Sequence, residues 1–462
     1  MFEAGVYAQR RRQLKQQFSS GLLLLPGNTD VSMNYPHNHY WFRQDSSFSY
    51  FFGLDQPELV GLIDIEADVD ILFGDDAGLN EVIWVGPQAA LGQRARDAGI
   101  ERVQPSGELA ATLAEARRQG RAIHYLPPYR GETILQLAGW LGCTPAQCEA
   151  GASESLMKAV IALREIKSEV EIEEIENALS VTRDMHLAAM RQAKADVFEY
   201  QVVAAMEGIM RGHGLQGAYP MIFSRSGEIL HNRDHHNRLR SGDLVVNDAG
   251  ASSALGYASD VTRTFPVGGR FSERQRSLYE IVLAAQQLAI AMMRPGVSYL
   301  EVHKQAARHM VAAMSELGFF HGTAEQVVES GAYAICFPHG LGHQMGLDVH
   351  DMEGLGETRV GYDASVSRSE LFGLRNLRLA KPLQAGMVVT VEPGIYFIPV
   401  LIQRWREEAR HSNLINYEKF AEYLDFGGIR IEDDVLVTAS GARVLGPAIP
   451  KSCAEIEALM AA

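Results

Sequence analysis

The sequence predicts two domains, an α/β domain at residues 1–152 followed by a larger α+β domain at residues 153–462. Three observations predict this organisation. Short apolar runs alternate with helical segments over residues 20–150, which is typical of an α/β fold. Residues 153–210 then have the spacing of nearly continuous helix. Beyond them, helices followed by antiparallel strands occur twice, as in an α+β domain.

Composition narrows the class of protein. A chain with 47% hydrophobic and 21% charged residues has the make-up of an ordinary soluble globular protein. The net charge of −15 argues against nucleic acid or an anionic membrane as a partner. No apolar stretch approaches ~18 residues and none follows the N-terminal arginines, so we expect neither a membrane span nor a secretory signal. The four cysteines are sparse, and reduced thiols in a cytoplasmic protein are the expectation.

The first domain shows strand signals but no nucleotide site. Apolar runs predict strands at residues 21–26, 59–64, 69–73 and 122–126. A helix is predicted over residues 108–118. Gly53 and Gly61 lack the spacing and the following helix of a phosphate-binding fingerprint. The aromatic-rich segment at residues 42–52 fits core packing better than an interface.

The segment at residues 241–266 carries the first chemical signal. An apolar run leads into Asp248, a glycine-containing turn follows, and a second run ends at Asp260. A hairpin between the two strands would bring both carboxylates to one end of a sheet. Because two carboxylates in apolar surroundings repel each other, one pKa rises unless a cation lies between them. Each Asp alone would be a turn-forming residue, but the pair with the residues below predicts a site.

Three histidines follow in a glycine-rich segment, namely His339, His343 and His350. His339 and His343 are four residues apart, which on a helix is a familiar zinc-binding arrangement. The glycines between and after them argue against a helix here. We therefore expect one of the three histidines to be a metal ligand and the others to line a pocket.

Two glutamates complete the set. Glu392 ends an apolar run before a Pro-Gly turn, and Glu432 follows Arg430 on the same face of a later strand. A charge at the end of an apolar strand is costly unless it is paired or bound to metal. With Asp248, Asp260 and a histidine, they suit Mn²⁺ or Co²⁺ better than a structural zinc. Five ligands exceed the need of one ion and favour a two-metal site that activates water.

These residues in their settings resemble the proline-specific metallopeptidases of the pita-bread fold, prolidase and aminopeptidase P. The matching motifs in chain order are DAG, SDVTRTFP, HGLGH, EPGIY and GGIRIEDD. The segments FRQDSSFSYFFG and EVIWVG resemble the family's N-terminal domain, and LREIKSEVEIEEI resembles its linker helix, so the resemblance covers nearly the whole chain. It implies a pita-bread catalytic domain and a proline-containing peptide as substrate.

The resemblance also implies a role for each ligand. Asp248 would chelate one of two divalent ions, manganese foremost, with cobalt or zinc as alternatives. Asp260 and Glu432 would bridge both ions. His343 and Glu392 would bind the second ion, and Glu392 would also act in catalysis by shuttling the proton.

Further residues would surround the substrate. His231 and His350 fall where the family places catalytic-pocket histidines, the latter near the scissile carbonyl. Arg430 would hold a bridging carboxylate, and Arg378 would grip the carboxylate of proline in a dipeptide. Trp84 resembles a tryptophan that reaches a neighbouring subunit's pocket, which implies a homodimer or a dimer of dimers.

Several alternatives remain open. We favour an Xaa-Pro dipeptidase over aminopeptidase P because of Arg378 and of the insertion at residues 405–423 between Glu392 and Glu432. Arg378 as a solvated loop residue and Trp84 as a half-buried core residue are the competing interpretations. A methionine aminopeptidase is not expected with this N-terminal domain. A creatinase-like enzyme or a binding module without metal is disfavoured, because all five ligands are present.

Overall fold

The computed structural model describes residues 1–461, which form two compact units. The first comprises Met1–Arg164 with Met352–Gly356, and the second comprises Glu165–Asp351 with Glu357–Ala462. Within residues 1–461, no helix combines the length and apolar character needed to cross a membrane. The four cysteines are free thiols.

Helix α8 (Glu154–Arg164), which follows the predicted domain boundary at residue 152, packs with the first compact unit. The guanidinium of Arg164 donates a hydrogen bond to the Ser47 hydroxyl, and the Tyr50 hydroxyl donates one to the Leu163 carbonyl. These contacts hold α8 on that unit.

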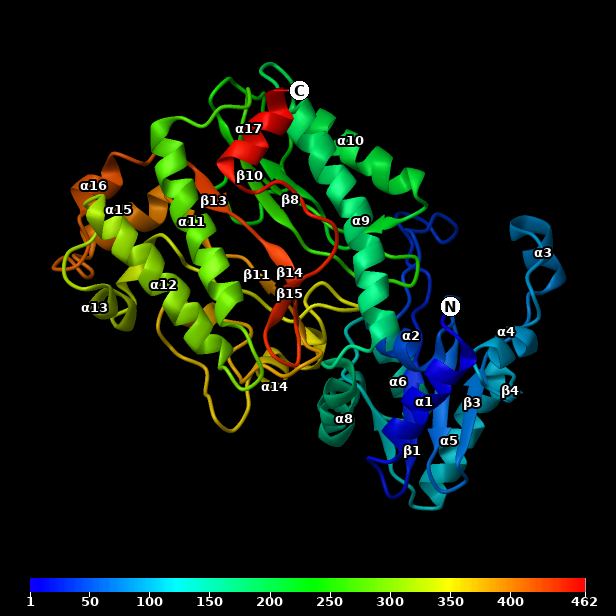
Figure 1. Cartoon of the computed structure of the whole chain (residues 1–462). Coiled ribbons are helices and arrows are strands. Elements are labelled where there is room, and N and C mark those ends of the chain that lie inside the picture. Colours follow the sequence, from blue (N-terminus) through cyan, green and yellow to red (C-terminus); the bar gives the residue numbers. More distant parts are fainter. Residues whose placement is uncertain (462) are drawn as a thin grey trace. The chain divides into compact units, whose positions relative to one another are not determined.

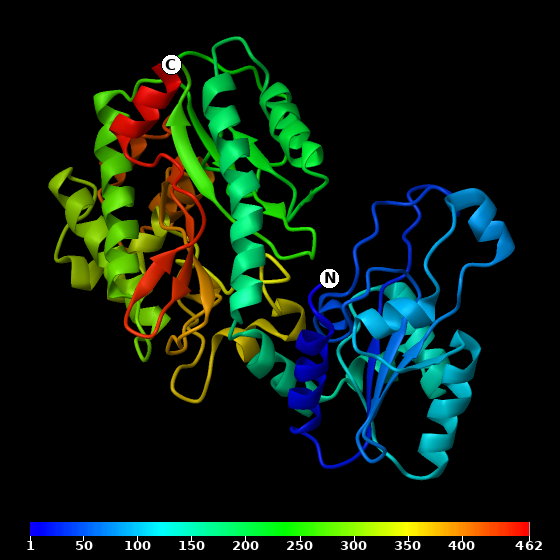
Figure 2. The same ribbon diagram turned by 45° about the vertical axis from the view of Figure 1, so that its right-hand side comes forward.

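The first unit is built on a five-stranded mixed sheet with the strand order β4-β3-β2-β1-β5 (Figures 1 and 2). β1 and β2, and β2 and β3, pair antiparallel, whereas β5 joins β1 and β4 joins β3 in parallel. The strands are β1 (Leu22–Pro26), β2 (Val60–Asp64), β3 (Val69–Phe73), β4 (Arg102–Gln104) and β5 (Ile123–Tyr125). The four predicted strands are therefore confirmed, and β4 is an addition to them.

Helices cover this sheet, and the aromatic-rich segment forms part of the core. The helices are α1 (Ala4–Lys15), α2 (Ser46–Phe52), α3 (Leu79–Val85), α4 (Leu91–Asp97), α5 (Leu109–Arg118), α6 (Gly131–Leu141), α7 (Pro145–Ala150) and α8. The rings of Phe48 and Phe52 on α2 stack 5.2 Å apart and are buried. A Cβ on Gly61 of β2 would stand 2.1 Å from the Phe52 ring, so this strand requires glycine there. Core packing of residues 42–52 is thus confirmed.

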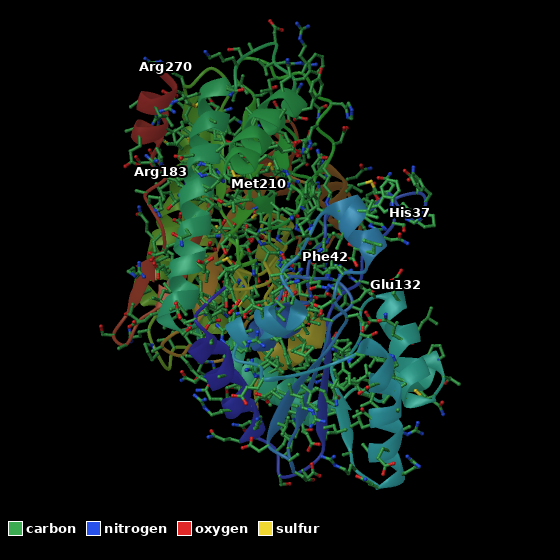
Figure 3. The ribbon with its side chains drawn as sticks, turned by 90° about the vertical axis from the view of Figure 1, so that its right-hand side faces the viewer. His37, Phe42, Glu132, Arg183, Met210 and Arg270 are labelled. Atoms are coloured by element: carbon green, nitrogen blue, oxygen red, sulfur yellow. The ribbon has the colours of Figure 1, made fainter. Side chains whose placement is uncertain are left out.

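The second unit contains two long helix pairs that flank its strands (Figure 1). The pairs are α9 (Glu169–Gln192) with α10 (Glu199–Gly212), and α11 (Glu273–Met292) with α12 (Tyr299–Glu316). Met210 on α10 is buried, whereas Arg183 on α9 and Arg270 lie toward the surface (Figure 3). The expectation of nearly continuous helix over residues 153–210 is confirmed by α8, α9 and α10. Between α8 and α9, Ser168 begins the new helix and forms a capping box with Glu171.

The strands of the second unit form small antiparallel sheets. One has the order β10-β8-β7, another β11-β14-β15, and two strand pairs are β12-β13 and β6-β9. Their bounds are β6 (Gln216–Gly217), β7 (Ile222–Ser224), β8 (Leu244–Asp248), β9 (Ala251–Ser252), β10 (Thr262–Pro266), β11 (Val388–Val391), β12 (Gly394–Tyr396), β13 (Gly428–Arg430), β14 (Asp433–Val437) and β15 (Ala442–Val444). The remaining helices are α13 (Ala324–Glu329), α14 (Glu357–Gly361), α15 (Pro399–Glu407), α16 (Tyr417–Ala421) and α17 (Cys453–Ala461).

A buried arginine on α1 organises the first unit. The Arg11 guanidinium is fully buried and donates to Asp70 at 2.8 Å, to the Phe51 carbonyl at 2.7 Å and to the Gly99 carbonyl at 2.7 Å. It thereby ties α1 to α2, β3 and the turn after α4. Removing it leaves a carboxylate and two carbonyls without these donors.

We therefore expect Arg11→Met to lower the free energy of unfolding of the first unit by about 3 kcal/mol. Urea unfolding measures the change. Arg12→Met is the matched control, because Arg12 is the next residue on α1 and is exposed. Equal unfolding midpoints for the two variants would contradict the structural role assigned to Arg11.

Candidate metal and substrate site

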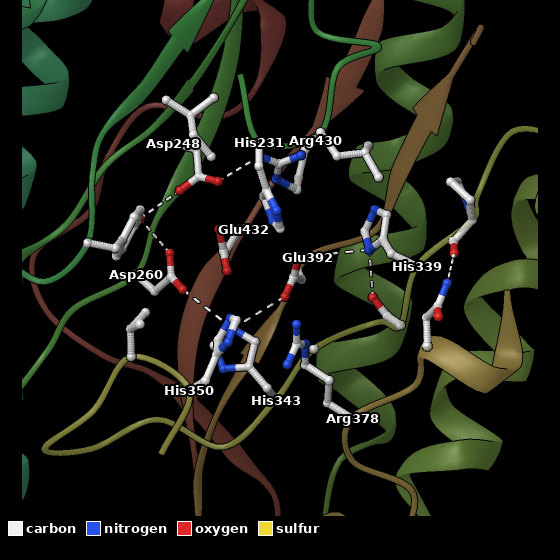
Figure 4. Close-up of a pocket in the computed structure, with 18 of the residues that line it drawn as sticks. His231, Asp248, Asp260, His339, His343, His350, Arg378, Glu392, Arg430 and Glu432 are labelled. Atoms are coloured by element: carbon white, nitrogen blue, oxygen red, sulfur yellow. Dashed lines mark hydrogen bonds and ion pairs between the residues drawn. The ribbon is translucent and has the colours of Figure 1, made fainter. Parts of the chain in front are cut away.

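A cavity of about 500 Å³ in the second unit collects the predicted chemical residues (Figure 4). It is lined by Asp248, Asp260, His343, Glu392, Glu432, His231, His339, His350, Arg378 and Arg430 among others. These residues come from strand ends and loops far apart in the sequence. Trp84 is the exception, because it lies on α3 of the first unit.

The aspartates meet at the end of the β8–β10 hairpin, as the sequence predicts. Asp248 is the last residue of β8 and pairs with Thr262, the first residue of β10, which places Asp260 next to it. The Tyr219 hydroxyl lies 2.6 Å from an oxygen of each of the two carboxylates. Burial raises the pKa of Tyr219 well above its usual value, so the phenol keeps its proton between them.

His343 lies beside two carboxylates of the cavity. Its Nε2 atom lies 3.4 Å from Asp260 and 3.5 Å from Glu392. Burial alone would lower the pKa of His343, but the contacts with these two carboxylates raise it to about 9. One donor atom each of Asp260, His343 and Glu432 lies within 4.8 Å of the others, close enough to hold a metal ion.

The protein's own side chains balance only part of the negative charge of these carboxylates. Burial, and then repulsion from neighbouring carboxylates, raises the pKa of Glu432 well above its usual value. The pKa of Glu392 rises to about 7, chiefly through burial. The Thr262 hydroxyl donates to Glu432 at 2.6 Å, which offsets only part of the cost. This buried set of oxygen donors with one imidazole fits hard or borderline divalent cations.

Arg430 holds Asp248 rather than one of the expected bridging carboxylates. Its Nη2 atom donates to Asp248 at 2.6 Å, Nη1 donates to the Tyr396 hydroxyl at 2.9 Å, and Nε donates to Thr262 at 3.1 Å. The reason is geometric, because β13, which ends at Arg430, packs beside β8, which ends at Asp248. The expectation of a contact with Asp260 or Glu432 is thus corrected.

The other three histidines line the cavity as neutral side chains. Burial lowers the pKa of His339 to about 3, and its Nε2 atom lies 2.9 Å from the Tyr396 hydroxyl. Burial, followed by the nearby His343, lowers the pKa of His350, whose ring centre is 4.3 Å from that of His343. Burial and the charge of Arg430 lower the pKa of His231. Neutral imidazoles can both donate and accept hydrogen bonds to a bound peptide.

The rest of the lining contributes a cluster of arginines, namely Arg233, Arg368, Arg375 and Arg378, with Glu357 among them. Arg378 lies 3.8 Å from Glu357, and Arg368 also forms an ion pair with that carboxylate. Only Arg378 was singled out from the sequence. The available signal for Arg368 and Arg375 was the repeated arginine between residues 359 and 378, within an extended, charged loop.

Uncharged residues behind the carboxylates were missed from the sequence. Tyr219, Thr262 and Tyr396 make the contacts described above, and Thr390 accepts a hydrogen bond from the His343 amide at 3.1 Å while donating to Glu392 at 3.2 Å. The available signal was the pair of β-branched strand runs that contain Thr262 and Thr390.

Trp84 is 85% exposed, so the interpretation as a half-buried core residue is wrong. Leu79, Ile83 and Val85 on the same short helix are also exposed. The loop that contains Tyr40 and Trp41, both exposed, extends from the same end of the sheet as α3 (Figures 1 and 2). The first unit therefore presents apolar and aromatic side chains to solvent at this end.

Comparison with known proteins identifies two family models in this chain. The model of metallopeptidase family M24 matches residues 173–439, and that of the aminopeptidase P N-terminal domain matches residues 7–124. An Xaa-Pro dipeptidase of Homo sapiens is 28% identical over 98% of this chain and 91% of its own length. An Xaa-Pro aminopeptidase of Escherichia coli is 30% identical over 98% of this chain and 97% of its own length.

Solved structures agree in fold over the full chain. The Pseudomonas aeruginosa aminopeptidase PepP superposes with a TM-score of 0.81 at 29% identity, covering 100% of this chain and 98% of its own. A zinc-substituted E. coli aminopeptidase P in complex with product gives the same TM-score, identity and coverage.

The acidic cluster generates a prediction about metal content. Glu432→Ala removes one of the crowded carboxylates, so we expect divalent-ion affinity to fall by at least roughly 10- to 100-fold. The metal-free variant should be no less stable than the metal-free wild type, because repulsion among the remaining carboxylates is relieved. Elemental analysis after dialysis and thermal unfolding in chelator measure the two effects.

Glu407→Ala, at an exposed position on α15, serves as the control. Unchanged metal content in Glu432→Ala would show that Glu432 holds no ion.

Proposed function

The chain belongs to metallopeptidase family M24, and from that premise we propose that it is a metal-dependent Xaa-Pro dipeptidase of the prolidase type. A member of this family is a metal-using hydrolase. In this chain the pita-bread catalytic domain follows an aminopeptidase P N-terminal domain in the sequence. Its relatives include enzymes named Xaa-Pro dipeptidase and enzymes named Xaa-Pro aminopeptidase. The preference for dipeptides is therefore argued from the pocket of this chain.

The observation that carries the proposal is the uneven distribution of charge in the pocket. Carboxylates gather around Asp260 and Glu432, whereas four arginines, none of them buried, line the same cavity with Glu357 as the single carboxylate among them. The planar guanidinium of Arg378 is suited to bind a carboxylate through two parallel hydrogen bonds. A dipeptide that ends in proline places its free carboxylate one residue beyond the scissile bond, within a cavity of about 500 Å³. A longer peptide has an amide at that point.

The carboxylates and His343 support a pair of divalent ions, and we assign manganese to them, with cobalt or zinc as alternatives. In this assignment the ions would be held by Asp248, Asp260, His343, Glu392 and Glu432. When bound, two such ions lower the pKa of a shared water and polarise the scissile carbonyl.

The protein's own residues bind the substrate and move the proton. Glu392 lines the cavity and lies 3.5 Å from His343, and from there it would pass a proton to the leaving proline nitrogen. His231 and His350 face the cavity as neutral imidazoles and would orient the scissile carbonyl. A tertiary Xaa-Pro amide has no N–H, so its recognition depends on ring shape and on the terminal charges.

The exposed aromatic end of the first unit supports an assembly of subunits. We assign Trp84 to a contact with a neighbouring subunit, in a homodimer or a dimer of dimers. An 85% exposed tryptophan with apolar neighbours on the same helix is the kind of surface that a protein partner covers. The four free cysteines support a reducing compartment, the cytoplasm.

The second candidate is an Xaa-Pro aminopeptidase acting on longer peptides, which the likeness to solved aminopeptidase P structures favours. The deciding experiment compares hydrolysis of Ala-Pro, Ala-Pro-amide and Ala-Pro-Ala by the manganese-loaded protein. We expect Ala-Pro to be the best of the three substrates. Faster turnover of Ala-Pro-Ala would favour the aminopeptidase, and no turnover of any of them would refute the proposal.

Arg378→Ala tests the carboxylate subsite directly. We expect kcat/KM for Ala-Pro to fall roughly 30- to 150-fold, because losing a charged hydrogen-bonded pair costs about 2 to 3 kcal/mol of binding free energy. The already low rate on Ala-Pro-amide should change little. Arg406→Ala, an exposed arginine on α15 outside the pocket, is the matched control. An unchanged Ala-Pro rate in Arg378→Ala would rule out this subsite.

Trp84→Ala tests the assembly. If Trp84 lies in a subunit contact, light scattering should show a smaller assembly or a higher dissociation constant than for the wild type. Trp41→Ala, at another exposed tryptophan, shows whether the effect is specific to α3. A wild-type protein that is already monomeric and fully active would remove the assigned contact.

A further inference from the structure

The segment at residues 225–237 carries two pocket residues without a strand to support them. It leaves β7 after Ser224 and returns toward β8, and its middle brings His231 and Arg233 to the cavity. Figure 4 shows the His231 ring close to Arg430 and Asp248. A loop of this length needs fixed ends if its central imidazole is to keep one position.

A single buried carboxylate fixes both ends of this loop. Glu199, the first residue of α10, is 0% exposed. One of its oxygens accepts a hydrogen bond from the Arg225 amide at 2.8 Å. The other accepts from the Asn237 amide at 3.3 Å and from the Asn237 side-chain nitrogen at 2.9 Å. The donors thus come from the first and last residues of the loop.

No basic side chain within residues 1–461 forms an ion pair with Glu199. The guanidinium of Arg225, whose backbone amide donates to Glu199, pairs instead with Asp243 at 3.2 Å. A buried carboxylate without a cation depends on hydrogen-bond donors, and here all three belong to the loop. The burial of Glu199 therefore depends on the donors of the loop, and the path of the loop depends on the carboxylate that accepts their hydrogen bonds.

Weaker contacts extend the same support toward His231. The side chain of Asn232 donates to the Ser224 hydroxyl at 2.9 Å, and the Tyr200 amide donates to the His235 carbonyl at 2.9 Å. Each of these fixes one short part of the loop. Glu199 differs from them because it connects the two ends.

We propose that Glu199 is a positioning residue for His231, acting by closing the loop at residues 225–237. It does not line the cavity and so has no direct contact with a substrate there. The consequence for catalysis rests on the proposed function, in which His231 orients the scissile carbonyl. The closure of the loop does not rest on the proposed function, because it is argued from hydrogen bonds of the structure, chiefly those of the Glu199 carboxylate.

Glu199→Gln is the sharpest test, because it keeps the size of the side chain and turns one acceptor into a donor that faces N–H groups of the loop. We expect kcat/KM for Ala-Pro to fall roughly 10- to 100-fold, since a small displacement of an orienting group has effects of that order. In a His231→Ala background the same change should have little further effect, because residues that act through one another are not additive.

Hydrogen–deuterium exchange supplies a readout that does not depend on activity. The amides of residues 225–237 should exchange faster in Glu199→Gln, while those of β8 and β10 stay protected. Glu457→Gln is the matched control, because that carboxylate accepts a hydrogen bond from the Phe271 amide at 3.0 Å, away from the cavity. It should change neither the exchange of the loop nor the hydrolysis of Ala-Pro.

Three results would overturn the inference: unchanged exchange of the loop in Glu199→Gln, unchanged kcat/KM in that variant, or an equal loss of kcat/KM in the wild-type and His231→Ala backgrounds. If the wild-type protein does not hydrolyse Xaa-Pro bonds at all, the proposed function fails. The exchange measurement then still decides whether Glu199 closes the loop.

Discussion

Four carboxylates in one buried cavity are the constraint on which the rest of this structure depends. Burial and mutual repulsion raise the pKa of Asp260, Glu392 and Glu432, and only Asp248 has an arginine partner. Such a group of buried carboxylates is stable only if the backbone holds each carboxylate in place and if cations neutralise the negative charges. The fold meets the first condition by placing the acids at or next to strand ends, where ladder hydrogen bonds fix the chain.

A buried arginine shows how far that rigidity extends. Arg263 on β10 donates to the carbonyls of Thr262, Glu432, Ile449 and Pro450 and to the carboxylate of Asp433, so all its N–H groups are used. It fixes the backbone at Glu432 without contacting any carboxylate of the cavity. The pocket histidines, and the pocket arginines other than Arg430 on β13, lie outside the strands instead, and their positions depend on separate contacts such as those of Glu199.

The sequence predicted most of the acidic group, because a carboxylate directly after an apolar β-branched run is costly unless it has a function. The same argument does not predict the contacts of Tyr219 and Thr390, or which carboxylate pairs with Arg430. Their contacts join segments far apart in the chain, and neither hydrogen bonds nor neighbouring strands can be deduced from spacing alone. The packing of α8 could not be predicted for a similar reason, because its helical pattern is clear but its packing partners, Ser47 and Tyr50, lie more than 100 residues earlier.

In the proposed function, charge would also decide how a zwitterionic dipeptide lies in the cavity. The four acids Asp248, Asp260, Glu392 and Glu432 have one arginine, Arg430, beside them, and bound divalent ions would balance their negative charge. The four other lining arginines, none of them buried, have only Glu357 as a lining carboxylate beside them. A dipeptide bound in reverse would place its ammonium group among these arginines. In the proposed direction its carboxylate would lie there instead, so the arginines would select the orientation that puts the scissile bond near the four acids.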